Sequence, residues 1–237
     1  MNEPTEHAHV TTPYFSQASF RFLKDLAAHN DRSWFATHKD RYEAHVREPF
    51  LRLIADLAAP LATISPHLRA DARRQGGSLF RLHRDTRFAN DKTPYKTWAG
   101  ARLFHERSRE IEAPSYYIHL QPGDCFAGGG VWHPQPATLK RIRDFLVDNP
   151  EAWKRATRSR SFAARYRFWG ESLTRPPRGY PADHPLIDDL KRKNHAAGCA
   201  MDDALMCSAE LRPVLVEHFR RLAPLLDYLC AALDLSF

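Results

Sequence analysis

The chain has 237 residues, 43% of them hydrophobic, with five tryptophans, fourteen phenylalanines and a net charge of +7. This apolar content excludes wholesale disorder, and the length suits one domain that buries roughly 70% of the surface of its unfolded chain. No run reaches the ~18 to 20 consecutive apolar residues of a membrane-spanning helix, and the polar start has no apolar signal segment. We therefore expect a cytoplasmic protein without membrane contact, with a mobile tail over residues 1–13 and a single domain over residues 14–237.

Apolar residues at helical spacing predict two helical stretches near the N-terminus. The first covers residues 20–26 and should end at Asn30–Asp31, a pair that breaks helices. The second runs from residue 34 to residue 61 with apolar spacings of three, four and seven. Pro49 lies inside it and lacks the amide hydrogen that a helix interior needs. We expect a kink there, or a new helix that begins near Glu48.

The middle of the chain changes to the period of two that half-buried strands show. Alternation over residues 78–83, which places Phe80 and Leu82 on the buried face, predicts a first strand. Turn-prone segments separate three further extended candidates, at residues 97–105, 115–121 and 124–131. Neighbouring strands joined by short turns predict an antiparallel sheet that starts at residues 78–83.

Helical patterns return after these strands. Pro136 suits the first turn of a helix, and the last forty residues carry a long apolar stripe from Leu211 to Leu229. Residues 173–185 contain four prolines and predict an irregular loop, followed by a short helix near residues 186–193. The expected fold class is α+β: a single domain in which a mostly antiparallel sheet packs with N-terminal and C-terminal helices.

The densest group of functional side chains is the sixteen-residue run from Arg81 to Lys96, RLHRDTRFANDKTPYK. It combines five Lys or Arg residues with two aspartates, a histidine and a tyrosine, a set too polar for a core segment. Guanidinium and ammonium groups bind phosphate or carboxylate oxygens, so convergence of these cations would form an anion pocket. The ligand-binding side chains expected there are those of Arg81, Arg84, Asp85, Arg87, Asp91, Lys92, Tyr95 and Lys96, with Arg178 from the later loop beside them.

Three interpretations of this run stay open. In the first, it binds a small ligand that bears a phosphate or carboxylate, and Asp85, Asp91 or Tyr95 transfers a proton if a reaction occurs. In the second, the protein is associated with nucleic acid: the basic segments 69–109 and 154–178 track a phosphate backbone, and exposed rings stack on bases. In the third, the run is a structural loop whose aspartates pair with its arginines.

Other motifs say less about chemistry. The four cysteines lie far apart without a C-x-x-C pair, which favours reduced structural thiols. No metal-ligand motif is present, so the sequence predicts no metal site, and it leaves any cofactor and the oligomeric state open. Gly128–Gly130 before the helix at Pro136 either cradles a phosphate or permits close backbone approach in a strand. A pocket between these glycines and the basic run would combine both features.

The basic run also resembles a known family. Its pattern R-x-x-R-D-x-R-F-x-x-D-K-x-P-Y-K is similar to the signature of the domain of unknown function 2461 family, a group of mostly bacterial proteins of about this length. The resemblance covers about residues 15 to 235. Its further matching blocks are Asn30–Phe35 with Tyr42 and Pro49, Gly128–Gly130 with Trp132 and Pro134, and Pro177–Tyr180 with Leu190–Lys193. The resemblance implies an α+β domain without an established activity.

Overall fold

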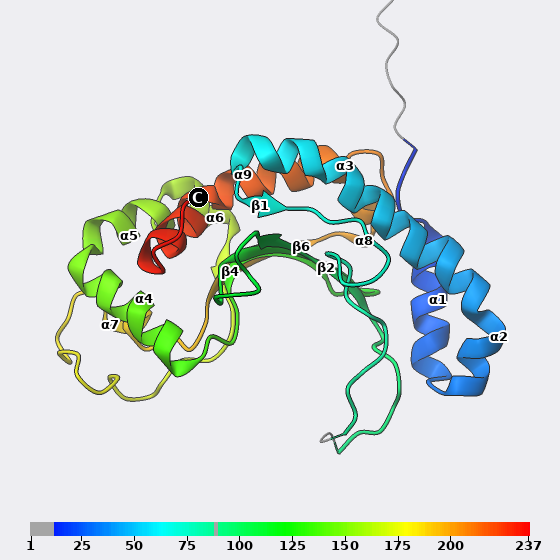
Figure 1. Cartoon of the computed structure of the whole chain (residues 1–237), viewed down its shortest axis with the longest axis horizontal. Helices are drawn as coiled ribbons and strands as arrows, with labels where there is room; N and C mark the ends of the chain where they lie inside the picture. Colours follow the sequence, from blue (N-terminus) through cyan, green and yellow to red (C-terminus); the bar gives the residue numbers. More distant parts are fainter. Residues whose placement is uncertain (1–11, 88–89) are drawn as a thin grey trace, which may run out of the picture.

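A curved antiparallel sheet forms the centre of the fold (Figure 1). The computed structural model describes residues 12–87 and 90–237, so the predicted mobile tail lies outside the described residues except for its last two. The spatial order of the strands is β1-β2-β3-β4-β6-β5, and each neighbouring pair is antiparallel. In chain order the strands are β1 (Leu68–Arg69), β2 (Ala99–His105), β3 (Ser115–Leu120), β4 (Cys125–Val131), β5 (Arg167–Phe168) and β6 (His195–Met201).

Two long helices cover one face of this sheet. α3 (Glu48–Ile64) and α9 (Leu211–Ala232) pack against each other, and α9 lies along β4 (Figure 1). Alternate residues of β3 point into this layer. Tyr116 is fully buried there: its ring stacks on Phe219 at 4.4 Å between centroids, and its hydroxyl donates to the Phe219 carbonyl at 2.7 Å. The apolar core of the domain therefore lies between the sheet and α3 and α9.

The N-terminal helices follow the sequence pattern. α1 (Gln17–Ala28) ends before the predicted break, and α2 (Arg32–Tyr42) begins after Asp31, whose carboxylate accepts the Trp34 N–H at 2.9 Å. One π-helical turn, η1 (Glu43–Arg47), then leads into α3, which begins at Glu48 with Pro49 in its first turn. The proline lies where a helix needs no N–H donor. The predicted new start near Glu48 is confirmed.

Shorter helices form a lobe beyond β5 and β6, at the left of Figure 1. Trp153 is buried at its centre, with ring centroids 5.6 Å from Phe168, 5.8 Å from His195 and 5.2 Å from Tyr228. The predicted irregular loop is confirmed over residues 173–185. The remaining helices of the C-terminal half are α4 (Pro136–Asp148), α5 (Pro150–Thr157), α6 (Arg160–Arg165), α7 (Ile187–Leu190) and α8 (Asp203–Met206).

Two details of the predicted sheet are wrong. Residues 78–83 do not form one strand: the Phe80 N–H donates to the Gly100 carbonyl, but the Leu82 carbonyl accepts from Lys96, each at 2.9 Å. The segment thus pairs first with β2 and then with the second arm of a hairpin. Phe80 is exposed rather than buried. The sheet starts at β1 instead. The sheet also includes β6, which was not predicted. Most residues of β6 are small, whereas β-branched and aromatic residues are typical of strands.

The predicted fold class is confirmed. The chain is a single α+β domain whose antiparallel sheet packs with helices from both the N-terminal and the C-terminal parts. Within the described ranges, no helix combines the length and the apolar content needed to cross a membrane.

Candidate ligand-binding site

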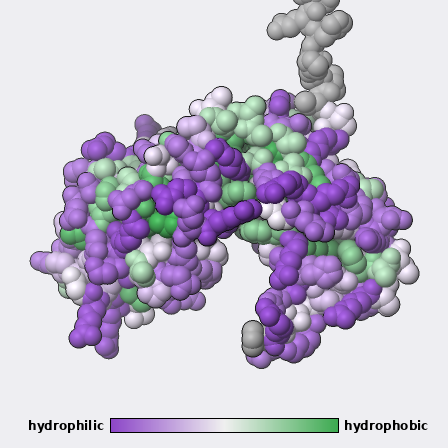
Figure 2. All heavy atoms as spheres, viewed as in Figure 1, coloured by the Kyte–Doolittle hydropathy of each residue, from purple (hydrophilic) through white to green (hydrophobic). Residues whose placement is uncertain are grey.

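The face of the sheet opposite α3 and α9 carries a cleft. It lies in the hollow between the C-terminal lobe and the hairpin built from residues 81–96, and Figure 2 shows that the surface is deeply indented there. Its volume is about 930 Å³, near the upper end of the usual range for small-molecule sites. The size and position of this cavity make it the leading candidate for a functional site.

Glycines form much of the floor of the cleft. Gly128 of β4 lies opposite Gly198 of β6, and both lie beneath Trp169, whose ring lines the cavity. A Cβ atom at Gly198 would lie 2.0 Å from Cη2 of Trp169, and one at Gly128 would lie 2.7 Å from its Cζ3. Only glycine at both positions lets this indole rest on the backbone of two strands. The glycines of β4 thus serve close approach within a strand, and the next helix begins only at Pro136.

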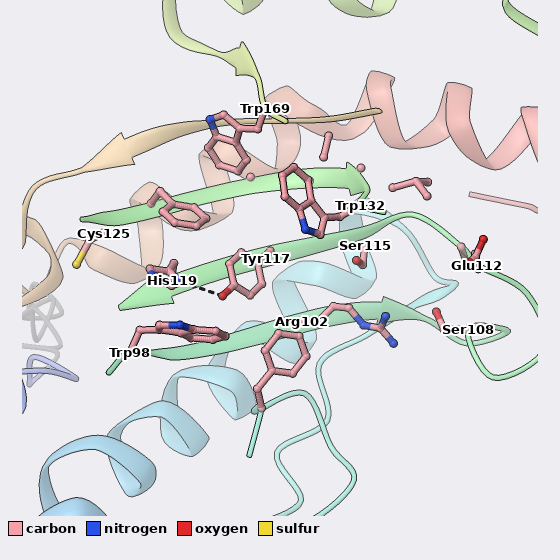
Figure 3. A pocket seen from close by; sticks show the side chains of 18 of the residues that line it. Trp98, Arg102, Ser108, Glu112, Ser115, Tyr117, His119, Cys125, Trp132 and Trp169 are labelled. Carbon is pink, nitrogen blue, oxygen red and sulfur yellow. Dashed lines mark hydrogen bonds between the residues drawn. The ribbon is translucent and has the colours of Figure 1, made fainter. Parts of the chain in front are cut away.

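A row of aromatic rings crosses this floor (Figure 3). Ring centroids are 4.9 Å apart between Trp98 and His119, 4.4 Å between His119 and Phe126, and 4.8 Å between Phe126 and Trp169. We call these four side chains the aromatic row. Tyr117 lies beside it, 5.6 Å from Phe126. The row presents a nearly continuous apolar wall along one side of the cavity.

His119 contributes a neutral ring to this row. Its Nδ1 accepts from the Tyr117 hydroxyl at 2.8 Å, which leaves Nε2–H to donate to the Gln121 side-chain oxygen at 3.2 Å. Burial lowers the pKa of His119 below its ordinary value, so the imidazole is uncharged at neutral pH. Both ring nitrogens are occupied, and the ring lies between those of Phe126 and Trp98.

Two arginines in the cavity wall form no direct ion pair with a described carboxylate. Arg102 on β2 and Arg109 in the following turn both line the cleft, and neither joins an ion pair between described residues. Burial lowers the pKa of Arg102, although a guanidinium stays charged at neutral pH. Partly desolvated and unpaired guanidinium groups bind carboxylate or phosphate strongly.

Ser108 adds a third polar group beside these arginines. It also lines the cleft, and its hydroxyl is buried without a hydrogen-bond partner in the described part of the chain. Figure 3 shows the Arg102 guanidinium extending toward Ser108. Buried hydroxyls are normally hydrogen-bonded, so an open donor here suits an oxyanion. We call Arg102, Ser108 and Arg109 the anion triad.

A second cavity of about 830 Å³ adjoins the first, and both are lined by the anion triad and Phe80. Its other arginines are compensated: Arg69 pairs with Glu106, and Arg73 pairs with Asp71. The carboxylates that line one or both cavities belong to Asp71, Glu106, Glu110, Glu112 and Asp124. These carboxylates outnumber the four arginines that line the two cavities. Positive charge is therefore concentrated at the triad and does not continue along the two cavities.

The run from Arg81 to Lys96 forms a hairpin that projects from the sheet (Figure 1). The Arg84 N–H donates to the Pro94 carbonyl at 2.8 Å, and Tyr95 is buried at the base. Asn30 fixes this base, because its amide donates to the Tyr95 carbonyl at 2.9 Å and its side-chain oxygen accepts the Tyr95 N–H at 3.0 Å. The hairpin is thus attached to the turn between α1 and α2.

Asn30→Ala should lower the free energy of unfolding by about 1–2 kcal/mol, because two hydrogen bonds to one partly buried backbone segment are lost. Hydrogen exchange at the hairpin amides should accelerate in the same variant. Asn30→Asp keeps the acceptor for the Tyr95 N–H and should lose less. Unchanged stability and exchange in Asn30→Ala would contradict this role.

Two of the three arginines of the hairpin, Arg84 and Arg87, pair with its aspartates. Arg84 contacts the carboxylate of Asp91 and the hydroxyl of Thr93, and Arg87 contacts Asp85 at 2.8 Å. The Arg84 guanidinium, with hydrogen bonds from Thr93, holds the pKa of Asp91 down to about 2. This pairing agrees with the structural-loop interpretation. Whether the same cations also bind an external anion stays a prediction.

The lysines also contact groups of the hairpin and its base. Lys92 donates to a hairpin carbonyl at 3.0 Å, and Lys96 donates to the Arg81 carbonyl at 2.8 Å. The Lys96 ammonium lies 5.5 Å from the Phe80 ring centroid and 5.0 Å from that of Trp98, and burial lowers its pKa. Lys96 is therefore a predicted ligand-binding residue that contacts two rings of the cleft lining, those of Phe80 and Trp98.

The predicted position of Arg178 beside the hairpin is wrong. The loop that carries it, residues 173–185, lies across the hollow from the hairpin (Figure 1). The reason is topological: this loop follows β5 at one end of the sheet, whereas the hairpin precedes β2 near the other end. Phe88, another residue of the run, lies outside the described residues.

The three catalytic candidates differ in accessibility. Asp85 and Asp91 are exposed and each has an arginine partner. Tyr95 is buried with its ring centroid 4.4 Å from that of Phe35, and burial raises its pKa. A catalytic role for them stays a prediction. No group of three His, Cys, Asp or Glu side chains capable of holding a metal ion occurs over residues 12–87 and 90–237.

The sequence indicated a pocket between Gly128–Gly130 and the basic run, but not its aromatic lining. Large aromatics such as Trp98, Trp132 and Trp169 are expected mostly in the core, with one or two beside the pocket, whereas Trp132 is 53% exposed and the other two are half-buried. The sequence signal for this lining was the alternation over residues 115–121. It places Tyr117 and His119 on one face of the strand and the apolar residues on the other. Which rings meet on that face depends on strand register, which the sequence does not display.

Fold and cleft together define an α+β protein with a cleft lined by aromatic side chains. The chain matches the family described as "Conserved hypothetical protein (DUF2461)" over residues 18–228. It belongs to this family, as the resemblance of the basic run implies. No curated protein and no solved structure matches the chain.

Proposed function

We propose that the cleft binds a small ligand bearing a phosphate or carboxylate group. The observation that supports this most strongly is the anion triad: two arginines that form no ion pair among the described residues line the same cavity as a buried hydroxyl that has no described partner. Two such positive charges complement a phosphate dianion, and each guanidinium presents a fork that matches its oxygens. The Ser108 hydroxyl supplies one further donor.

The proposal places the anion outside the hairpin, although the hairpin contributes to the cleft. Lys96 spans the rings of Phe80 and Trp98, which line the cavity. Arg84 and Arg87 already share their charge with aspartates of the hairpin. They can take part only if an incoming anion competes with those carboxylates. Among the described residues Arg102 and Arg109 form no ion pair, although Asp71 is close enough to Arg109 for the guanidinium to lower its pKa, and this difference from Arg84 and Arg87 supports the cleft.

Single-stranded nucleic acid is the second candidate ligand. The aromatic row supplies rings of the kind that single-strand binders use, and the triad belongs to the basic segment 69–109. A long phosphate backbone also needs a continuous cationic track, and the carboxylates of the two cavities interrupt it. Binding of a dT10 oligonucleotide that weakens steeply with salt would favour this candidate over the small ligand.

The proposal is tested by titration calorimetry with AMP, ribose 5-phosphate, 2-naphthoate and inorganic phosphate. Arg102→Ala and Arg109→Ala should each weaken the binding of these anions about 10-fold or more, because a hydrogen bond to a charged group contributes about 1.5–3 kcal/mol. Arg220→Ala is the matched control, since Arg220 is an exposed arginine on α9, the helix that covers the opposite face of the sheet. Its affinities should equal those of the wild type.

Arg84→Ala separates the cleft from the hairpin. This variant loses the contact with Asp91 at an exposed position, and its fold and its affinity for the anions should be preserved. Loss of anion binding in Arg84→Ala, with normal binding in Arg102→Ala and Arg109→Ala, would move the site to the hairpin. Failure of every anion to bind the folded wild type would overturn the proposal.

A further inference from the structure

Trp132 is an exposed large aromatic at the edge of the cleft. Its exposure is 53%, and Figure 3 shows its indole turned toward the middle of the cavity. Among the described residues its one close ring contact is with His133, at 4.7 Å between centroids. Leaving an indole in water forgoes much of the stabilisation that its burial would supply. The side chain is therefore available to stack on something else.

The backbone holds Trp132 in this position. His133, the next residue, has a φ of 50°, in the left-handed region that non-glycine residues seldom adopt. Its N–H donates to the Asn194 side-chain oxygen at 2.6 Å, and the Gln135 N–H donates to the Glu112 carboxylate at 2.8 Å. The side chains of Asn194 and Glu112, which belong to distant segments, thus fix the turn. They keep the indole at the cleft although His133 adopts an unfavourable backbone conformation.

The floor and the aromatic row leave a flat-walled space beside this indole. Gly128, Ala196 and Ala200 contribute little or no side chain to the floor, while the row supplies ring edges, because His119 and Phe126 stack face to face on each other. A flat ring gains from stacking on the exposed indole of Trp132 and from edge contacts with the row. The row and Trp132 together suit a planar ring system.

The ring site and the anion triad lie within reach of one small molecule. Arg102 is in register with Tyr117, which is in register with Gly128, and that residue with Gly198. Three strand spacings separate the ends of this line, roughly 14 Å in all. A molecule that joins one ring system to one anionic group through a short linker can occupy both places.

We propose that the ligand carries a planar aromatic ring system joined to its phosphate or carboxylate, and that Trp132 stacks on this ring while the ring edges of the aromatic row contact it. The inference rests on the proposed function, because the triad holds the anionic end. It narrows the ligand class to aromatic or heteroaromatic anions and excludes simple sugar phosphates and short-chain carboxylates as preferred ligands. Trp132 is the residue that determines this preference.

Two matched pairs of probes test the ring: AMP against ribose 5-phosphate, and 2-naphthoate against acetate. In titration calorimetry the ring-bearing member should bind at least about 10-fold more tightly in at least one pair, as stacking on an aromatic side chain predicts. Trp132→Ala should remove most of that advantage and leave the affinity for the ringless probe unchanged. Trp132→Phe should retain part of it.

The outcomes separate this inference from the proposed function. Equal affinities within both pairs, with loss of binding in Arg102→Ala, would overturn the ring inference and leave the anion site standing. An unchanged ring advantage in Trp132→Ala would overturn the role of Trp132. Binding of adenosine as tight as that of AMP would show that the anion contributes nothing, which overturns the proposed function. Absence of binding by every probe would overturn both.

Discussion

Gly130→Ala should destabilise the protein by about 3 kcal/mol or more, enough to unfold a domain of ordinary stability in part. Gly130 lies in β4 with a φ of 136°, which side-chain-bearing residues rarely adopt. A Cβ atom there would lie 2.1 Å from the His195 carbonyl oxygen and 2.6 Å from the Ala196 Cα. Both obstacles are backbone atoms of the paired strand β6, so relief requires the two strands to separate.

Gly123→Ala is the matched control for this prediction. Gly123 also has a positive φ, 75°, but a Cβ atom there would meet nothing within 4 Å. It should therefore carry only the conformational penalty, about 1 kcal/mol. Urea denaturation of the two variants measures the difference. Equal losses of stability would mean that β4 and β6 are not paired as closely as described, and the floor of the cleft would then be misplaced.

Trp153→Ala should cost about 3–5 kcal/mol, as expected for deletion of a fully buried indole. Trp153 connects α5 to both the sheet and α9 through contacts with His195 and Tyr228. Its removal leaves a cavity at the centre of the C-terminal lobe. Chemical denaturation should show a lower midpoint with little change in the denaturant dependence.

Trp132→Ala makes the same chemical change at an exposed position and should alter stability by no more than about 0.5 kcal/mol. The contrast between the two tryptophans tests which of them is core and which is available to a ligand. If Trp132→Ala destabilised the fold as much as Trp153→Ala, the indole at the cleft would be a packing residue. Its proposed role in ligand preference would then lose its basis.

Most of the helices and three of the strands follow from local pattern. The break at Asn30, the helix start near Glu48 and the strands β2, β3 and β4 depend on periodicity and on proline or turn residues nearby in the sequence. β6 was not predicted because its small residues have a weak preference for strands. They form a strand by pairing with β4. Pairing with a strand distant in sequence, and not local strand preference, therefore determines that β6 forms.

The lining of the cleft could not be predicted for a related reason. Gly128 and Gly198 are seventy residues apart in sequence, and only strand register shows that both lie beneath Trp169. Likewise, Arg102 and Arg109 belong to a basic segment that the sequence identifies, but the lack of an ion-pair partner is a property of the folded chain. The run from Arg81 to Lys96 stands out in the sequence as too polar for a core segment, but its internal pairing emerged only from the hairpin geometry.

The most direct test of the ligand-binding cleft is an NMR titration of the indole N–H signals of the five tryptophans with AMP. The signals of Trp98, Trp132 and Trp169 should shift as AMP is added, because these rings line the cavity. The signal of Trp153, buried in the C-terminal lobe, should stay in place. Saturable shifts confined to the backbone amides of residues 84–96, or no shift at all in the cleft tryptophans, would contradict the account.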